Sequence, residues 1–429
     1  MRPIRLVLAL LALALVASPA LAQPTTITLG RFFGACDVPG VTIADAVGEA
    51  CIIQAIIDDF DQADNGVRVE TLPADWGNYY DQIKAMYAAG NPPTVHVMHS
   101  SSIPEFASIG ALTDLTDLLE GAGIDAGDWT DRALEAVSFG GRIYGVPMDA
   151  HANLWHVNLD LLAAAGLVDD AGAPILPGST EELLEHAAMV REATGARYLA
   201  ADFAEFPIGV RLVMSLVWQQ GGELFDAENA NVTSAEAERA VETIMSLFEG
   251  GYADPQLNYS DSQQSFLEGE AAILVNGTWV VDFYAAQASD PNVPLENYYV
   301  ADFPTLFDVG ATWASNHMWV IPSPAARDAD ALEAALGLLA HINDNNLAWS
   351  RTGHLAVRTS VLESDAYANL PHRDEYAGTA DIARDVQPVV RYDAIQDVLN
   401  RELQAIWLTG KPIDRALADA NAAVQDLLD

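Results

Sequence analysis

The chain has 429 residues, of which 20 are basic and 61 acidic, so its formal net charge is −41, and 51% of its residues are hydrophobic. This apolar content is enough for buried cores and excludes global disorder, while the length predicts two domains or one large one. The shortage of lysine and arginine argues against binding to nucleic acid, whose phosphates require clusters of these residues.

Residues 1–22 have the pattern of a secretory signal. Arg2 and Arg5 form a charged start, an apolar run follows over 6–17, and 20–22 (ALA) fit a cleavage site. The apolar run is shorter than the roughly 20 residues that span a bilayer, although an uncleaved anchor helix is the alternative. We therefore expect an exported, soluble protein that is cleaved after this motif.

The two cysteines, Cys36 and Cys51, are close in the sequence. In an exported protein they can form a disulfide, which would close a loop of roughly 15 residues and contribute about 3 kcal/mol in the chain-entropy model. A reactive thiol pair is the alternative, but the C-x-x-C spacing of redox sites is absent. The spacing thus favours a structural disulfide.

Strands and helices are predicted to alternate along the first part of the chain. The apolar spacing predicts strands over 26–30, 67–72 and 94–98, and helices over 51–61, 78–89, 103–109 and 112–119. This alternation is typical of an α/β fold in which helices cover both faces of a parallel sheet. Ligands in such folds lie beyond the carboxyl ends of strands, so His99 and Ser100, which follow a predicted strand, are candidate site residues.

The same alternation continues in the second part of the chain. A Gly-Gly turn at 140–141 leads into a strand that we expect to stop at Pro147, and a loop over 312–317 is expected before a strand over 318–321. Further elements are predicted as helices over 180–194, 210–220, 234–249, 262–267 and 325–343, strands over 271–276 and 298–303, and a helical tail over 398–428 that breaks at 410–412. No flexible linker divides the chain, which indicates that it crosses between lobes several times.

Five segments stand out in this order: 76–93 (WGNYYDQIKAMYAAGNPP), 141–162 (GRIYGVPMDAHANLWHVNLDLL), 266–279 (FLEGEAAILVNGTW), 353–358 (GHLAVR) and the tail over 409–428. Together they resemble the extracellular solute-binding proteins of family 1, the sugar-binding components of ABC importers. Each motif alone is weakly specific, but their order and spacing over nearly the whole mature chain are specific.

The resemblance implies the type II, maltose-binding-protein-like fold of periplasmic binding proteins, with two α/β lobes and a ligand cleft between them. Three hinge crossovers are expected near 147–150, 301–304 and 343–346. The N-terminal lobe would comprise 24–148 plus 303–345, and the C-terminal lobe 149–302 plus 346–429.

A sugar site needs aromatic rings against the apolar face of the sugar and polar side chains for its hydroxyls. Trp279 is similar to the stacking tryptophan of the family, and Asp149 and His151 follow the first crossover, where the family places ligand contacts. A carboxylate at 149 would accept two sugar hydroxyls. The other candidates, by their positions after strands, beside hinges or within the motifs, are Trp76, Asn276, Trp313, Asn316, His317 and Arg358.

The resemblance implies a periplasmic receptor that closes around a neutral sugar, oligosaccharide or glycosylated polyol and delivers it to the membrane permease subunits of an importer. We expect a monomer without catalytic activity, cofactor or metal. The few basic residues argue against a strongly anionic ligand, although Arg31, Arg211, Arg351 or Arg358 could bind one locally.

Two other functions remain open at this point. A secreted glycoside hydrolase needs two carboxylates about 5–10 Å apart, and 61 acidic residues can always offer such a pair. A receptor for a non-sugar solute, including a metal, is the second alternative. The pairs His96/His99 and His151/His156 do not have typical zinc spacings.

Overall fold

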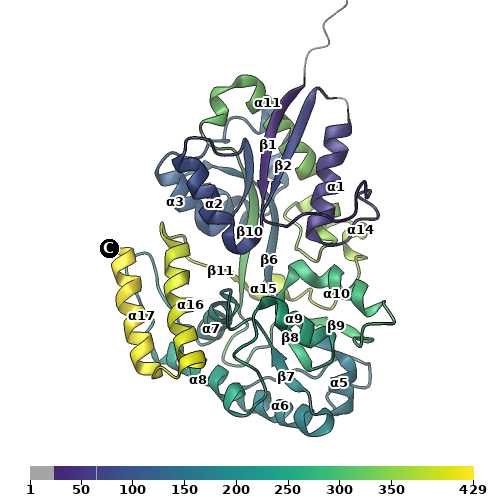
Figure 1. The fold of residues 1–429 in the computed structure, drawn as a ribbon, viewed down its shortest axis with the longest axis vertical. Coiled ribbons are helices and arrows are strands. Elements are labelled where there is room, and N and C mark those ends of the chain that lie inside the picture. Colours follow the sequence, from purple (N-terminus) through teal and green to yellow (C-terminus); the bar gives the residue numbers. More distant parts are fainter. Residues whose placement is uncertain (1–23, 64) are drawn as a thin grey trace, which may run out of the picture.

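The computed structural model describes residues 24–63 and 65–429 and has two α/β lobes, one above the other in Figure 1. The predicted signal over 1–22 lies outside the described residues. Within the described part, no helix is long and apolar enough to cross a membrane. The two lobes have separate hydrophobic cores, joined by two long strands, β6 and β10.

The first lobe is built on the parallel strands β1, β2 and β3, with β1 between the other two. Its elements are β1 (Thr25–Arg31), α1 (Gly48–Gln62), β2 (Val67–Pro73), α2 (Trp76–Ala88), β3 (Val95–His99), α3 (Ile103–Ser108), α4 (Asp131–Ala136), β4 (Ser138–Phe139), β5 (Arg142–Ile143) and α11 (Ala329–Asp344). Ile52, Ile56 and Phe60 of α1 recur at helical spacing and are buried in the first core, which explains how this helix covers the sheet.

The second lobe continues the same sheet in the order β6-β8-β7, with β9 also paired to β6. Its elements are α5 (Leu159–Ala164), α6 (Thr180–Thr194), β7 (Arg197–Ala200), α7 (Ile208–Gln219), α8 (Ala235–Glu249), α9 (Tyr259–Leu267), β8 (Ala271–Gly277), α10 (Val281–Ala288), β9 (Tyr298–Ala301), α16 (Tyr392–Thr409) and α17 (Ile413–Leu428). The short elements α12 (Asn346–Ser350), α13 (Thr359–Leu362), α14 (Asp365–Ala368), α15 (Thr379–Ile382) and β11 (Ala383–Asp385) lie between α11 and α16 in the sequence.

Strands β6 (Gly145–Asn158) and β10 (Thr312–Val320) pass from one core to the other. All 14 residues of β6 are buried, and they pair with β10 first and with β8 further along. On β10, Trp313 belongs to the second core and Met318 to the first; Phe303 also lies in the second core. The exact lobe boundaries and hinges stay predictions.

Two sequence expectations about these strands were wrong. The strand that was expected to stop at Pro147 runs on to Asn158, and residues 312–317, expected as a loop, form most of β10. The register between the two strands shifts between His317 and Met318, where the partners change from Asp149 to Pro147. Such a bulge accommodates a proline, which has no N–H for the ladder, without ending the strand.

The helix predicted over 112–119 is absent from the structure. Leu112 instead forms a β-bridge with Pro322, and the amides of Thr113 and Leu115 donate to the carbonyls of Ile321 and Ile143. These tertiary hydrogen bonds hold the start of the segment against neighbouring segments in place of a helix.

The disulfide between Cys36 and Cys51 is confirmed, with 4.6 Å between the two Cα atoms. It ties the loop after β1 to the first turn of α1, which carries Glu49.

His156 on β6 is fully buried and generates a prediction about acid stability. Its Nε2 donates to the carbonyl of Gly277 (3.1 Å), and its Nδ1 accepts from the hydroxyl of Tyr298 (2.7 Å). Burial lowers the pKa of His156 to about 3. The unfolded chain takes up this proton near pH 6.5, so the contribution of His156 to stability is present above that pH and is lost as the pH falls toward 3.

The free energy of unfolding of the wild type should fall between pH 7 and pH 5. We expect this fall to be smaller by about 2 kcal/mol in His156→Gln. Glutamine can still donate and accept hydrogen bonds but does not titrate. Urea unfolding of both proteins at the two pH values measures the difference. An identical pH dependence in the variant and the wild type would contradict the assignment.

Candidate functional site

A cavity of about 290 Å³ lies between the two lobes and receives side chains from both of them and from the crossing strands. Its size is at the lower end of the range for small-molecule sites, roughly 300–1,000 Å³. The cavity is lined by Phe32, Phe33, Gly34, Glu49, Asp75, Trp76, His99, His151, Phe206, Ile208, Arg211, Tyr259, Trp279 and His317.

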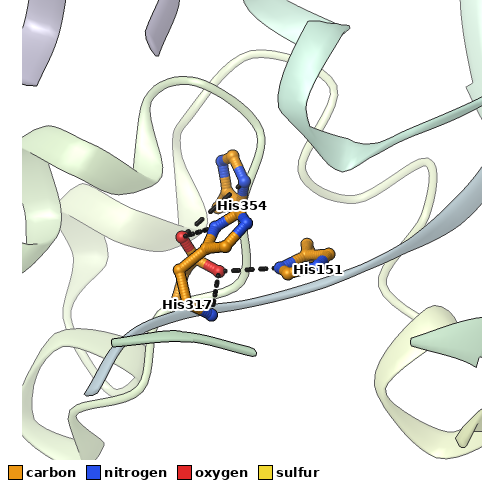
Figure 2. A group of neighbouring side chains, drawn as sticks. His151, His317 and His354 are labelled. Carbon is orange, nitrogen blue, oxygen red and sulfur yellow. Dashed lines mark hydrogen bonds and ion pairs between the residues drawn. The ribbon is translucent and has the colours of Figure 1, made fainter. Parts of the chain in front are cut away.

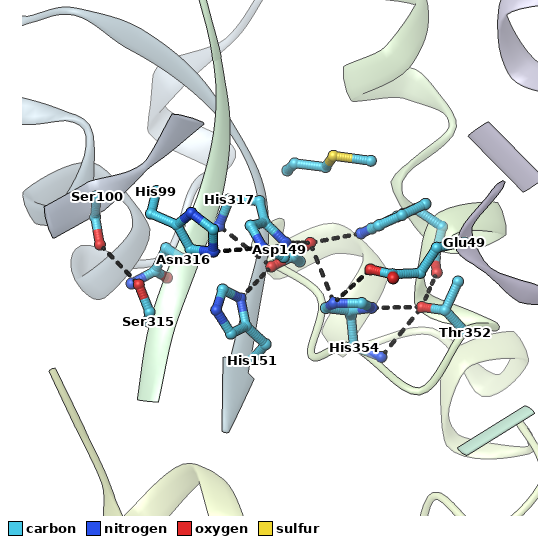
Figure 3. A network of polar contacts seen from close by, with 12 residues as sticks. Glu49, His99, Ser100, Asp149, His151, Ser315, Asn316, His317, Thr352 and His354 are labelled. Atoms are coloured by element: carbon cyan, nitrogen blue, oxygen red, sulfur yellow. Dashed lines mark hydrogen bonds and ion pairs between the residues drawn. The ribbon is translucent and has the colours of Figure 1, made fainter. Parts of the chain in front are cut away.

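The strand register places a row of polar residues at this cavity. His317 on β10 pairs with His99 at the end of β3 on one side and with Asp149 on β6 on the other. Ser315, two residues earlier on β10, pairs with His151. Figure 3 shows these side chains together with neighbours from helices and loops, among them Glu49 and His354.

Asp149 is the centre of this group and is fully buried. Its carboxylate accepts hydrogen bonds from Nδ1 of His151 (3.0 Å), Nδ1 of His317 (2.9 Å) and Nε1 of Trp349 (2.6 Å). Burial acts to raise the pKa of Asp149, but the interactions with His317, His354 and His151 outweigh it and hold the pKa well below the usual value. The carboxylate is therefore ionised and already satisfied, and its function is to orient its neighbours.

The carboxylate determines which nitrogen of His151 is available to a ligand. An ionised carboxylate only accepts hydrogen bonds, so Nδ1 of His151 must carry a proton. Burial, followed by the neighbouring His317, keeps the pKa of His151 well below its usual value, so the ring is neutral and its Nε2 has a free lone pair. This ring lines the cavity, and its Nε2 has no hydrogen bond to the described chain. It is suited to accept a hydrogen bond from a ligand hydroxyl.

His99 closes the row on the side of the first lobe. Its Nδ1 lies 2.7 Å from the hydroxyl of Tyr80, and its Nε2 lies 3.2 Å from Nε2 of His317. The ring of Phe32 stacks on His99 with 5.0 Å between the centroids. His99 is thus held rigidly at the cavity wall.

Aromatic rings from both lobes face one another across the cavity. Trp76 of α2 meets Phe206 of the second lobe edge to face, with 5.0 Å between the centroids. Trp279, which follows β8, donates from Nε1 to the hydroxyl of Tyr259 (2.8 Å) and lies against the backbone of Gly277. A Cβ atom on Gly277 would lie 1.9 Å from the Trp279 ring, so any larger residue there would displace the ring.

Five of the eleven predicted site residues line the cavity: Trp76, His99, His151, Trp279 and His317. Two others lie directly behind it. Asn276 accepts a hydrogen bond from Tyr259 (3.4 Å), and Asp149 supports the histidines. That any of them contacts the ligand stays a prediction.

The remaining four predicted residues do not line the cavity. Ser100 bonds to Ser315 (3.4 Å), and Asn316 donates to Asp385 (3.1 Å). Trp313 is buried in the second core, where the centre of its ring lies 3.9 Å from the guanidinium carbon of Arg211. Arg358 pairs with Asp128 (2.7 Å) and Asp344 (3.3 Å) and does not line the cavity.

Arg211 was considered only as a local contact for an anion, and the other lining residues were not predicted, namely Phe32, Phe33, Gly34, Glu49, Asp75, Phe206, Ile208 and Tyr259. Two signals could have revealed some of them. Phe32 and Phe33 directly follow β1, as His99 follows β3. Arg211 is the one charged residue in an otherwise apolar helix, IGVRLVMSLVWQ.

One group of side chains has its ligand atoms close enough together to hold a metal ion. Its members are Asp149, His151, His317 and His354, whose ligand atoms lie within 4.8 Å of one another (Figure 2). However, the carboxylate occupies the centre of this group and already accepts hydrogen bonds from His151 and His317 at 3.0 and 2.9 Å. The arrangement fits a hydrogen-bonded carboxylate better than a metal centre.

The lobes contact each other around the cavity. The amide of Gly48 in the first lobe donates to Asp282 in the second (2.6 Å), and Lys84 of α2 forms an ion pair with Asp393 of α16 (3.5 Å). These contacts join the two lobes beside the cavity, while Asp75 in the cavity lining is exposed.

These features define a two-lobed binding protein with its cavity between the lobes. Residues 55–375 match the model of the bacterial extracellular solute-binding protein family. The chain belongs to this family, which confirms the resemblance seen in the sequence motifs. The family consists of binding proteins.

Individual relatives are distant. The GacH receptor of Streptomyces glaucescens, solved unliganded and in complex with acarbose, matches with a TM-score of 0.79 and 22% identity over 94% of this chain and 98% of its own. An uncharacterized lipoprotein of Streptomyces antibioticus is 29% identical over 37% of this chain, and the lactose-binding protein of Rhizobium radiobacter is 23% identical over 52%. The chain matches only 34% and 50% of the length of these two curated relatives.

The role of Asp149 leads to a prediction about stability. In Asp149→Asn a neutral amide would replace a carboxylate that accepts from two histidines and one tryptophan. Disrupting such a buried network costs about 3 kcal/mol or more, so we expect a loss of this size in the free energy of unfolding. Urea unfolding at pH 7 measures it, with Asp170→Asn in an exposed loop as the matched control. Equal stabilities of the two variants would show that Asp149 does not organise the site.

Proposed function

We propose that this protein is the periplasmic receptor of an ABC importer and that its solute is a sugar or a short oligosaccharide. The observation that carries the proposal is the cavity between the lobes, where the rings of Trp76, Phe206 and Trp279 surround a space beside the free Nε2 of His151. Rings of this kind cover the apolar face of a sugar. Acceptors or donors that have no partner within the protein can form hydrogen bonds with its hydroxyls. The named relatives that bind acarbose and lactose support the same ligand class.

Hinge closure is the mechanism that we propose for capture. The contacts of Gly48 with Asp282 and of Lys84 with Asp393 join the lobes across the cavity, so they must break on opening and re-form on closing. A ligand that touches residues of both lobes stabilises the closed state because only that state offers all of its contacts. The membrane permease subunits would then recognise the closed form.

We place the mature protein in the periplasm as a monomer, exported through the signal over 1–22 and cleaved after it. The family's extracellular character agrees with this location.

We further propose that the protein releases its ligand chemically unchanged. A hydrolase remains the second candidate because Glu49 and Asp75 both line the cavity. Burial, followed by the charges of Asp149 and Asp282, raises the pKa of Glu49 well above its usual value, as in a general acid. The chain belongs to a family of binding proteins, so binding is the conclusion that we favour.

A substitution of the stacking ring tests this function. For the sugar that most raises the melting temperature in a panel, we expect Trp279→Ala to lower the affinity at least tenfold, about 1.4 kcal/mol, in isothermal titration calorimetry. The matched control is Phe283→Ala, which removes a ring that is 38% exposed and does not line the cavity. The sugar should be recovered intact by chromatography.

Three outcomes would contradict the proposal. If no sugar raises the melting temperature, the ligand class is wrong. If Trp279→Ala binds as well as Phe283→Ala, the site is wrong. If the sugar is recovered as hydrolysis products, the protein is an enzyme.

A further inference from the structure

Arg211 differs from the other buried arginines of the described chain. Arg31 donates to the carbonyl of Gly34 and to Gln54 (2.6 Å), and Arg373 donates to the carbonyls of Ser350 (2.7 Å) and Gly353 (3.2 Å). Arg211 is 6% exposed, yet none of its side-chain nitrogens donates to an atom of the described residues, whereas in Arg31 and Arg373 only the Nε lacks a partner. The protein itself thus leaves this guanidinium unsatisfied.

The surroundings of Arg211 are aromatic rather than acidic. Its guanidinium carbon lies 3.9 Å from the centre of the Trp313 ring and 5.7 Å from the rings of both Trp76 and Trp279. No carboxylate oxygen of the described chain lies within 4.0 Å of its nitrogens, although acidic residues outnumber basic ones 61 to 20. Glu49 and Asp75 also line the cavity, but neither forms an ion pair with Arg211.

Arg211 nevertheless stays charged. Burial lowers its pKa to about 10, which still leaves the guanidinium protonated at neutral pH. Asp202 attracts this charge from beyond ion-pair distance, but no carboxylate of the described chain pairs with it directly, and a buried charge without a direct partner is costly. Cation–π contacts with the aromatic faces offset part of this cost. The rings do not, however, accept hydrogen bonds from the N–H groups, which lie in the plane of the guanidinium.

The position of Arg211 shows what could satisfy it. It lines the cavity, between the rings that we propose to stack on the sugar. A guanidinium held in this way offers two parallel N–H donors, which match the two oxygens of a carboxylate, a phosphate or a sulfate. The counter-charge missing from the protein would then arrive with the ligand.

We propose that the solute is a sugar derivative with one acidic oxyanion group, which binds to Arg211 while the sugar ring lies between Trp76 and Trp279. This inference rests on the proposed function and narrows it, since the overall shortage of basic residues had predicted a neutral ligand. One cation at the site is enough to bind one acidic group of the ligand, even though acidic residues outnumber basic ones in the chain.

The test compares each neutral sugar with its acidic counterparts. Glucose is titrated beside glucuronic acid, glucose 6-phosphate and glucose 6-sulfate, and galactose beside galacturonic acid and galactose 6-phosphate, by calorimetry at pH 7. We expect at least one acidic member to bind the wild type at least tenfold more tightly than its neutral parent. The member that binds best distinguishes a carboxylate, a phosphate and a sulfate as the source of the oxyanion.

Variants locate this preference. Arg211→Met keeps an apolar stem against the rings but removes the charge, so the preference for the acidic sugar should vanish, while Arg211→Lys should keep part of it. Arg239→Met, which removes a half-exposed arginine of α8, should leave the preference unchanged. If Arg211→Met does not fold, two measurements still test the proposal. They are the ratio of the affinities for the acidic sugar and its neutral parent in the wild type, and the same ratio in Arg211→Lys.

The possible failures are distinguishable. If neutral parents bind the wild type as tightly as every acidic counterpart, or if the preference persists in Arg211→Met, the inference about Arg211 is overturned while the sugar receptor stands. If neither these compounds nor any sugar or oligosaccharide of the melting-temperature panel binds, the proposed function fails, and this inference fails with it.

Discussion

The arrangement of the site depends on one buried carboxylate. Asp149 lies on β6, accepts from His317 of β10, and also accepts from Trp349 of α12. These three segments lie where the chain passes between the lobes or close to that point, so a single ionised group ties them together (Figure 3). An ionised carboxylate in a protein interior is tolerated only when donors surround it, and this requirement fixes the relative positions of the three segments.

The same requirement fixes the chemistry of the cavity wall. The carboxylate accepts hydrogen bonds from Nδ1 of His151 and from Nδ1 of His317, so the Nε2 of His151 remains available as an acceptor at the cavity. The cation of Arg211 also lines the cavity, among three tryptophans. The cavity therefore has a neutral acceptor and a positive donor, with aromatic faces between them. This combination can distinguish both the orientation and the charge of a small polar solute.

Much of the fold could be predicted from the sequence because its determinants are local. The helical spacing of isoleucines in α1 and the apolar run of β8 needed no tertiary information. The alternation of such elements indicated an α/β fold, and the ordered motifs indicated the family. Trp279 and His99 were found because the ends of strands are positions where ligands bind.

What could not be predicted depends on the pairing of distant strands. The antiparallel pairing of β10 with both β3 and β6 brings His317 beside His99 and Asp149, and no local pattern specifies this register. Asp149 looked like a ligand contact because its hydrogen bond with His317, 168 residues away, was not visible in the sequence. Arg358 looked like a site residue because its partner Asp128 is equally remote in the sequence.

A crystal structure of the protein with its most stabilising sugar would test the central claim most directly. The account predicts ligand density in the cavity between the lobes, with a ring against Trp279 and a hydroxyl about 3 Å from Nε2 of His151. A sugar bound elsewhere, or bound in the cavity with His151 turned away from it, would contradict the account.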